Sequence, residues 1–155
     1  MLGVILVLSG CSFFGTPAPT STSPTATPTV TASPTATPTP TVEAGPVLLP
    51  DGTAEDNLPL FAAITAAVWG SPDSVSGRAY IDALITAGFD RAAMQVTQDH
   101  TTVGNAAESL QFSVRWGDEC LVGQVGPATG APVTVVVPAL AEGNCLVGQT
   151  RPIDW

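Results

Sequence analysis

The chain has 155 residues and a formal net charge of −9, from 13 acidic and 4 basic residues. Such a charge repels phosphate backbones and anionic lipid surfaces, so nucleic-acid binding is disfavoured. Hydrophobic residues make up 45% of the chain and charged residues 11%. This composition excludes a chain that is disordered throughout because of high charge and low hydrophobicity. The length suits one folded domain and a tail.

Residues 1–10 are largely apolar and lead directly to Cys11. A run this short cannot cross a bilayer, which takes about 20 residues, but it matches the apolar part of a secretory signal peptide. Leu8-Ser9-Gly10-Cys11 resembles the lipobox of bacterial lipoproteins. The resemblance implies cleavage before Cys11, a diacylglycerol on its thiol, and a lipidated N-terminus at residues 11–15.

One feature of the signal departs from the usual pattern. A signal peptide begins with positively charged residues, and none precedes Cys11. We therefore expect a truncated positive region, with the true start upstream. The alternative is a buried apolar N-terminus with a free thiol at Cys11.

Residues 16–46 consist almost wholly of Thr, Pro, Ser, Ala and Val. Proline removes backbone donors and no apolar face can form, so we expect a disordered linker that favours the polyproline II conformation. At about 3.1 Å per residue, roughly 30 residues could reach about 90 Å when extended. The alternative is a proline-rich ligand for an SH3-like partner.

Residues 47–155 form the expected folded domain, and its first helix is predicted over residues 58–69. Thr53 can cap this helix together with Asp56, in the capping-box spacing. Pro59 is tolerated only in the first turn of a helix, so Asn57 is a rival cap. The apolar positions on one helical face are Phe61, Ile64, Ala67 and Val68.

A second helix is predicted from about Pro72 or Val75 to Ala87. Gly88 suits the left-handed position just after a helix, and Phe89 can then pack back on the last turn. The apolar stripe of this helix consists of Tyr80, Ile81, Leu84 and Ile85.

Alternating apolar residues from Leu110 to Trp116 are typical of a half-buried strand. The Gly117-Asp118 turn that follows predicts an antiparallel hairpin with a strand at 120–125. Further strands are predicted at 95–98, 133–137 and 145–150. The expected class is α+β, with two N-terminal helices on a four- or five-stranded, mainly antiparallel sheet.

Cys120 and Cys145 each begin the pentapeptide Cys-Leu-Val-Gly-Gln. An exported domain with two remaining cysteines favours a disulfide between them; two buried free thiols are the alternative. A zinc site is disfavoured because the chain has a single histidine. We expect no metal and no cofactor.

No catalytic motif is present, so we expect no enzyme activity. The alternative is a small hydrolase in which His100 works with a carboxylate such as Asp99 or Asp118.

A possible binding surface is predicted instead from arginine and tryptophan, which are frequent in binding patches. For Trp155, covering the edge of the core is the competing role. The predicted surface consists of Arg78, Arg115, Trp116 and Trp155.

Three segments, Phe112–Pro127, Gly143–Gln149 and Arg151–Trp155, resemble an uncharacterised family of actinobacterial lipoproteins. The resemblance implies a lipid-anchored protein on the extracytoplasmic face of the membrane of a Gram-positive bacterium, with no known activity. Our functional hypothesis is a non-enzymatic binding module, held off the membrane by residues 16–46. The expected partners are the membrane, through the lipid, and an extracellular protein or cell-wall glycan.

Overall fold

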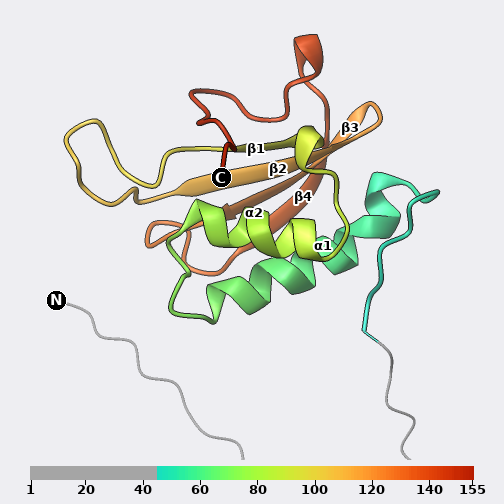
Figure 1. Cartoon of the computed structure of the whole chain (residues 1–155), viewed down its shortest axis with the longest axis horizontal. Helices are drawn as coiled ribbons and strands as arrows, with labels where there is room; N and C mark the ends of the chain where they lie inside the picture. Colours follow the sequence, from blue (N-terminus) through green and yellow to red (C-terminus); the bar gives the residue numbers. More distant parts are fainter. Residues whose placement is uncertain (1–44) are drawn as a thin grey trace, which may run out of the picture. The chain divides into compact units, whose positions relative to one another are not determined.

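The structure is a computed structural model that describes residues 45–155. The predictions for residues 1–10, for Cys11, for residues 11–15 and for all but the end of the linker lie outside this range. Two helices, two short 3₁₀ turns and four strands follow one another in the described part (Figure 1). Their bounds are α1 Ala54–Trp69, α2 Gly77–Thr86, η1 Arg91–Ala93, β1 Met94–Val96, β2 Leu110–Trp116, β3 Glu119–Val125, β4 Val133–Pro138 and η2 Ala141–Gly143.

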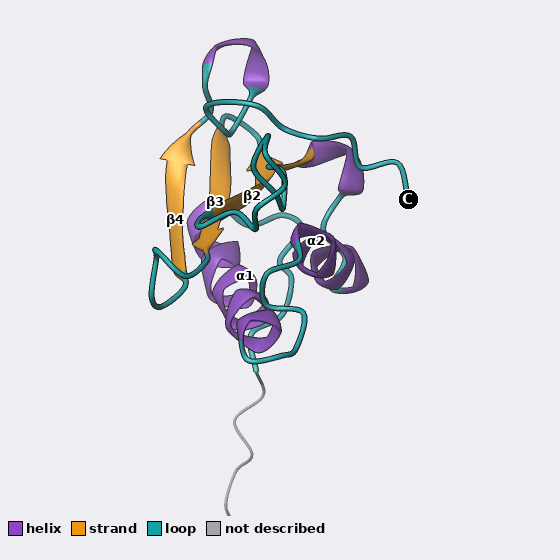
Figure 2. Ribbon diagram, turned by 90° about the vertical axis from the view of Figure 1, so that its left-hand side faces the viewer, coloured by secondary structure: helices purple, strands orange, loops and turns teal. Residues whose placement is uncertain are grey.

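The four strands form one antiparallel sheet in the order β1-β2-β3-β4. Both helices lie on the same face of this sheet (Figure 2). Helix α1 packs mainly against β3 and β4, whereas α2 packs against β1 and β2. The predicted α+β class, with two N-terminal helices on an antiparallel sheet, is confirmed. Neither helix combines the length and the apolar character that crossing a membrane requires, among the residues described.

Helix α1 begins earlier than predicted, and Thr53 rather than Asn57 is its cap. The Thr53 side chain accepts from the Asp56 N–H at 3.1 Å, and Asp56 accepts from the Thr53 N–H at 2.9 Å. Pro59 therefore lies inside the helix. Pro59 has no N–H to donate to the carbonyl of Glu55. Glu55 is exposed, so its carbonyl can accept a hydrogen bond from water instead.

The buried side of α1 is partly different from the prediction, because Ala67 is exposed. Asn57 and Thr65 are buried instead, and both are polar. The Asn57 amide bonds the backbone of Leu49 at 2.8 and 2.9 Å. The Thr65 hydroxyl donates to the Phe61 carbonyl at 2.8 Å. These local bonds satisfy groups that would otherwise be costly to bury.

Helix α2 starts at Gly77, later than predicted, and its N-terminus is capped from a distant loop. The Ser76 side chain makes no capping bond, and the Gly77 N–H instead donates to the Asp99 carboxylate at 2.9 Å. The other end of α2 follows the prediction. Gly88 has a φ of 99°, and the Phe89 N–H donates to the Leu84 carbonyl at 3.1 Å, which is the Schellman pattern.

Phe112 is at the centre of the core between the helices and the sheet. Its ring stacks on Tyr80 with centroids 4.5 Å apart and lies 5.6 Å from the ring of Phe61. Gly123 faces it on β3, where an added Cβ would lie 2.4 Å from the Phe112 ring. The glycine of the first pentapeptide is therefore the position that makes room for the Phe112 ring.

The predicted strand at residues 145–150 is wrong, and the sheet has four strands. Only one isolated bridge, between Thr97 and Thr150, remains of it. Gly148 has a φ of 109°, which breaks an extended segment, and Val147 is 80% exposed. The second pentapeptide is held instead by the disulfide at Cys145, described below.

Tyr80 supplies a pH test of this core. Burial raises the pKa of Tyr80 to about 12 from 10.0, and its hydroxyl donates to the Ser74 carbonyl at 2.8 Å. The unfolded phenol loses its proton near pH 10 and the folded one near 12, so the free energy of unfolding should fall as the pH rises across this window. Below pH 10 this contribution is fully present.

The measurement is direct because Tyr80 is the single tyrosine of the chain. Tyrosinate absorbance should appear near pH 12 in the folded protein and near pH 10 in the urea-unfolded protein. In Tyr80→Phe, the free energy of unfolding should not vary between these two values. An absorbance rise near pH 10 in the folded protein would contradict the expected burial.

Candidate functional site

Two groups of polar side chains contact residues 143–155. The first joins Trp155 to α2. The Arg78 Nε lies 3.1 Å from an Asp82 carboxylate oxygen, and the Trp155 indole N–H donates to the other oxygen at 2.9 Å. The Arg78 guanidinium carbon lies 5.4 Å from the centre of the Trp155 ring, which is cation–π distance.

Arg151 approaches the same tryptophan from the loop side. Its guanidinium carbon lies 5.0 Å from the centre of the Trp155 ring. Its Nη2 bonds both oxygens of Asp99 at 3.1 and 2.9 Å. Since Asp99 also caps α2 through Gly77, one carboxylate ties the helix to the end of the chain. We call Arg78, Asp82, Asp99, Arg151 and Trp155 the arginine–tryptophan cluster.

The charged groups of this cluster are matched within it. The Asp99 and Arg151 side chains are only 22% and 21% exposed, so their bond is worth more than an ordinary surface pair. The backbone adds a further hydrogen bond, from the Arg151 N–H to the Val96 carbonyl at 2.9 Å. The cluster therefore fastens the chain end to the domain and leaves little charge for a ligand.

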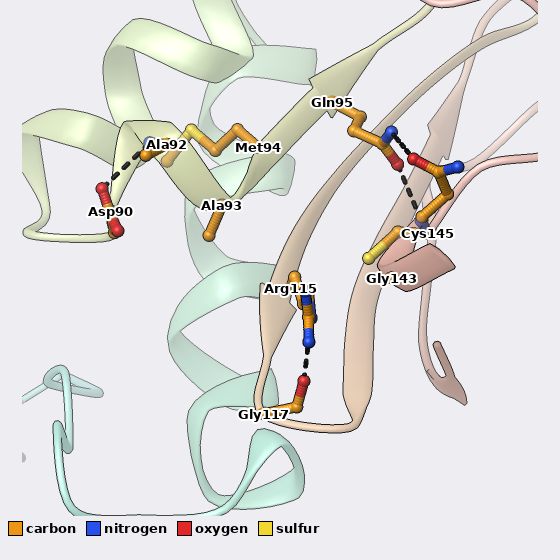
Figure 3. A pocket seen from close by; sticks show the side chains of 10 residues that line it. Asp90, Ala92, Ala93, Met94, Gln95, Arg115, Gly117, Gly143 and Cys145 are labelled. Carbon is orange, nitrogen blue, oxygen red and sulfur yellow. Dashed lines mark hydrogen bonds between the residues drawn. The ribbon is translucent and has the colours of Figure 1, made fainter. Parts of the chain in front are cut away.

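The second group lines an open pocket of about 500 Å³ (Figure 3). The pocket lies beside the β2–β3 turn, and Gln95, Arg115 and the disulfide place it on the sheet face opposite the helices. Its walls come from η1, from β1 and β2, and from the segment that follows η2. The residues that matter most here are Asp90, Ala92, Ala93, Arg115, Gly143 and Cys145.

Arg115 is the cation of this pocket. Its Nε donates to the Gly117 carbonyl at 3.0 Å, and its two terminal nitrogens bond no other group among residues 45–155. An added Cβ on Gly143 would lie 2.5 Å from one of those nitrogens, and Gly143 has a φ of 77°. The positive φ favours glycine at this position, and the turn there lies against the guanidinium.

The remaining arginines are engaged elsewhere. Arg78 and Arg151 form the two ion pairs of the arginine–tryptophan cluster. Arg91 donates to the Ile153 carbonyl. Arg91 and Arg115 thus bond only backbone carbonyls among residues 45–155, and Arg115 is the one of the two that lines the pocket.

Asp90 stands on another wall of the pocket. One of its oxygens accepts from the Ala92 N–H at 2.9 Å and so caps η1. The second oxygen has no partner within the described part of the chain. Figure 3 shows Ala93 between Asp90 and Arg115.

The third wall of the pocket depends on Gln95 and a disulfide. The Gln95 side-chain oxygen accepts from the N–H groups of Cys145 and Leu146 at 2.7 and 3.2 Å, and its amide donates to Asn144 at 2.9 Å. The predicted disulfide is present between Cys120 and Cys145, whose Cα atoms are 5.6 Å apart. These contacts hold the segment after η2 against the sheet.

The four residues of the predicted binding surface are distributed over the domain. Arg78 and Trp155 come together, whereas Arg115 is in the pocket. Trp116 belongs to the helix-covered side, where its indole N–H donates to the Gly52 carbonyl at 2.7 Å and its ring meets Phe89 edge-on. The four do not share one concavity.

The hydrolase alternative needs His100 beside a free carboxylate. His100 is exposed in the loop before β2, and Asp118 lies in the turn after β2, so the full length of this strand separates them. Both oxygens of Asp99 are bonded to Arg151. Residues 45–155 also contain no group of three or more His, Cys, Asp or Glu side chains placed to hold a metal ion.

Comparison with known families gives one match. The family described as "Domain of unknown function (DUF6993)" matches residues 65–149, which is more than half of the chain. The chain belongs to this family. The matched range includes α2, all four strands, both disulfide cysteines and every residue named in the pocket. No curated protein and no solved structure matches the chain.

The family match confirms part of the predicted resemblance, namely an uncharacterised family. Sequence reasoning overlooked Asp82, although its spacing of four from Arg78 on a helix is a visible signal. It also overlooked Asp90 and Gln95 as pocket residues. No local pattern identifies either one, because their partners across the pocket come from segments far along the chain.

Replacing Asp99 tests the arginine–tryptophan cluster. Asp99→Ala removes the cap of α2 and leaves Arg151 without its carboxylate, so the free energy of unfolding should fall by about 1 to 3 kcal/mol. Urea unfolding measures the change. Asp73→Ala is the control, because the Asp73 side chain is exposed and makes no bond in the described domain. Equal stability of the two variants would contradict the role given to Asp99.

Removing the disulfide tests the third wall of the pocket. The variant Cys120→Ser/Cys145→Ser should lose about 3 kcal/mol of unfolding free energy, as expected for a loop closed over 25 positions. Cys11→Ser is the matched control and should be as stable as the wild type. Free thiols at both positions in the exported protein, found by mass spectrometry, would contradict the pairing.

Proposed function

We propose that this chain is an actinobacterial envelope lipoprotein whose folded domain is a non-enzymatic binding module. Cys11 carries the lipid on the extracytoplasmic face of the membrane, and residues 16–46 hold the domain away from it. The ligand is an extracellular protein or a cell-wall glycan. The proposal combines the lipobox-like sequence before the linker with the pocket of the domain.

The observation that carries the binding role is the open guanidinium of Arg115. A guanidinium presents a planar fork of donors that fits a carboxylate in two parallel bonds. In a chain with a net charge of −9, Arg78 and Arg151 pair with carboxylates, whereas Arg115 pairs with none among the described residues. An arginine without a carboxylate partner at a pocket of about 500 Å³ is suited to recognising a partner.

The extracytoplasmic location is supported by the disulfide between Cys120 and Cys145. Disulfides persist in oxidising compartments and are rare in reducing ones. The linker composition points the same way, because Thr/Pro/Ser-rich stalks are common between an anchor and an exposed domain.

Retention by the cell envelope tests the binding role. The full-length chain should be retained saturably by purified cell wall or by immobilised envelope extract, and Arg115→Gln should weaken retention about tenfold or more, since a charge-assisted bond is lost. Arg78→Gln is the control, because Arg78 is an exposed arginine outside the pocket. Absence of saturable retention by either material would overturn the binding role.

Fractionation of the same cells tests the location. The wild-type chain should appear in the membrane fraction and Cys11→Ser outside it, because the variant has no thiol to carry the lipid. Recovery of the wild type in the cytosol with residues 1–10 intact would contradict the anchor.

A further inference from the structure

We infer that the Arg115 pocket binds a small dipolar ion, namely an amino acid or short peptide with a free carboxylate and a free ammonium group. The inference rests on the proposed function for its premise that this pocket is a binding site. It adds a small ligand to the partners named there, and a second binding residue, Asp90.

Two opposite charges line one cavity. Asp90 and Arg115 both line the pocket, yet the two ion pairs of residues 45–155 are Arg78–Asp82 and Arg151–Asp99. Asp90 and Arg115 therefore face the same space without bonding one another. A ligand that carries both charges would complete two interactions that the protein leaves open.

Both charged side chains keep atoms that bond no other group among residues 45–155. Asp90 keeps one carboxylate oxygen free after capping η1 through the Ala92 N–H. Arg115 keeps both terminal nitrogens free after bonding Gly117 through Nε. The remaining oxygen is an acceptor for an ammonium group, and the two nitrogens are donors for a carboxylate.

Small apolar groups line part of the pocket. Ala92 and Ala93 line it with methyl groups, and Figure 3 places Ala93 between Asp90 and Arg115. Gln95 offers little to a ligand, because its oxygen accepts two N–H groups and its amide donates to Asn144. The polar contacts with a ligand therefore come from Asp90 and Arg115.

The net charge favours a dipolar ligand over a polyanion. The chain carries −9, and a phosphate entering the pocket would meet the Asp90 carboxylate as well as this overall field. A dipolar ion brings no net charge and pairs with both residues. A pocket of about 500 Å³ lies within the range used for small ligands and admits an amino acid or a short peptide.

The experiment uses the full-length chain and three forms of one peptide. Unmodified trialanine is compared by titration calorimetry with its N-acetylated form, which lacks the ammonium, and with its C-amidated form, which lacks the carboxylate. Each modified peptide should bind about tenfold or more weakly than trialanine, because each loses one charge-assisted interaction.

Two variants then assign each end of the peptide to a residue. Asp90→Asn keeps a side-chain cap for η1 and removes the charge, so it should weaken trialanine about tenfold without weakening the N-acetylated peptide further. Arg115→Gln should weaken trialanine similarly without weakening the amidated peptide further. Arg78→Gln is the matched control and should bind all three peptides as the wild type does.

The failures of the two proposals are distinguishable. Equal binding of trialanine and its N-acetylated form, unchanged in Asp90→Asn, would overturn the dipolar ligand and leave an Arg115-dependent binding module. Envelope retention without measurable binding of any of the three peptides would also overturn this inference alone. Loss of envelope retention itself would overturn the proposed function and this inference with it.

Discussion

The folded domain depends on how one segment is held against the exposed side of its sheet. The disulfide joins Cys145 to Cys120 on β3, and the Gln95 side chain binds the backbone of the same segment from β1. A covalent bond and a group of hydrogen bonds therefore fix residues 144–146 at two strands that are not neighbours in the sheet. The pocket and the course of the chain after it both follow from this attachment.

The pocket is a consequence of that attachment. Gly143 comes directly before the fixed segment, and its lack of a side chain leaves room for the Arg115 guanidinium. On another wall, Asp90 follows the Schellman turn of α2 and caps η1. Asp90 and Arg115 thus bring opposite charges to one cavity.

The same kinds of residues serve stability on the other side of the domain. In the arginine–tryptophan cluster, each guanidinium has a carboxylate and the two share one aromatic ring. Matched charges at partly buried positions hold the chain end and the start of α2 together. Arg115 differs from these two arginines because it has no carboxylate partner among the described residues, and we propose ligand recognition as its role.

The sequence by itself determined the local elements: the capping box at Thr53, the turn at Gly88 and the alternation along β2 are short-range patterns, and each predicts its structure from neighbouring residues. It also indicated the disulfide, because cysteines in an exported domain have few other uses. Only the tertiary structure decided the fate of the repeated pentapeptide. At Cys120 the pentapeptide is a strand paired with β2 and β4, whereas at Cys145 it is an irregular segment in which Gly148 has a φ of 109°. Identical residues fold differently there because the second copy is held by the disulfide and by the Gln95 side chain instead of by strand pairing. The pocket between Asp90 and Arg115 likewise arises from contacts that no local pattern encodes.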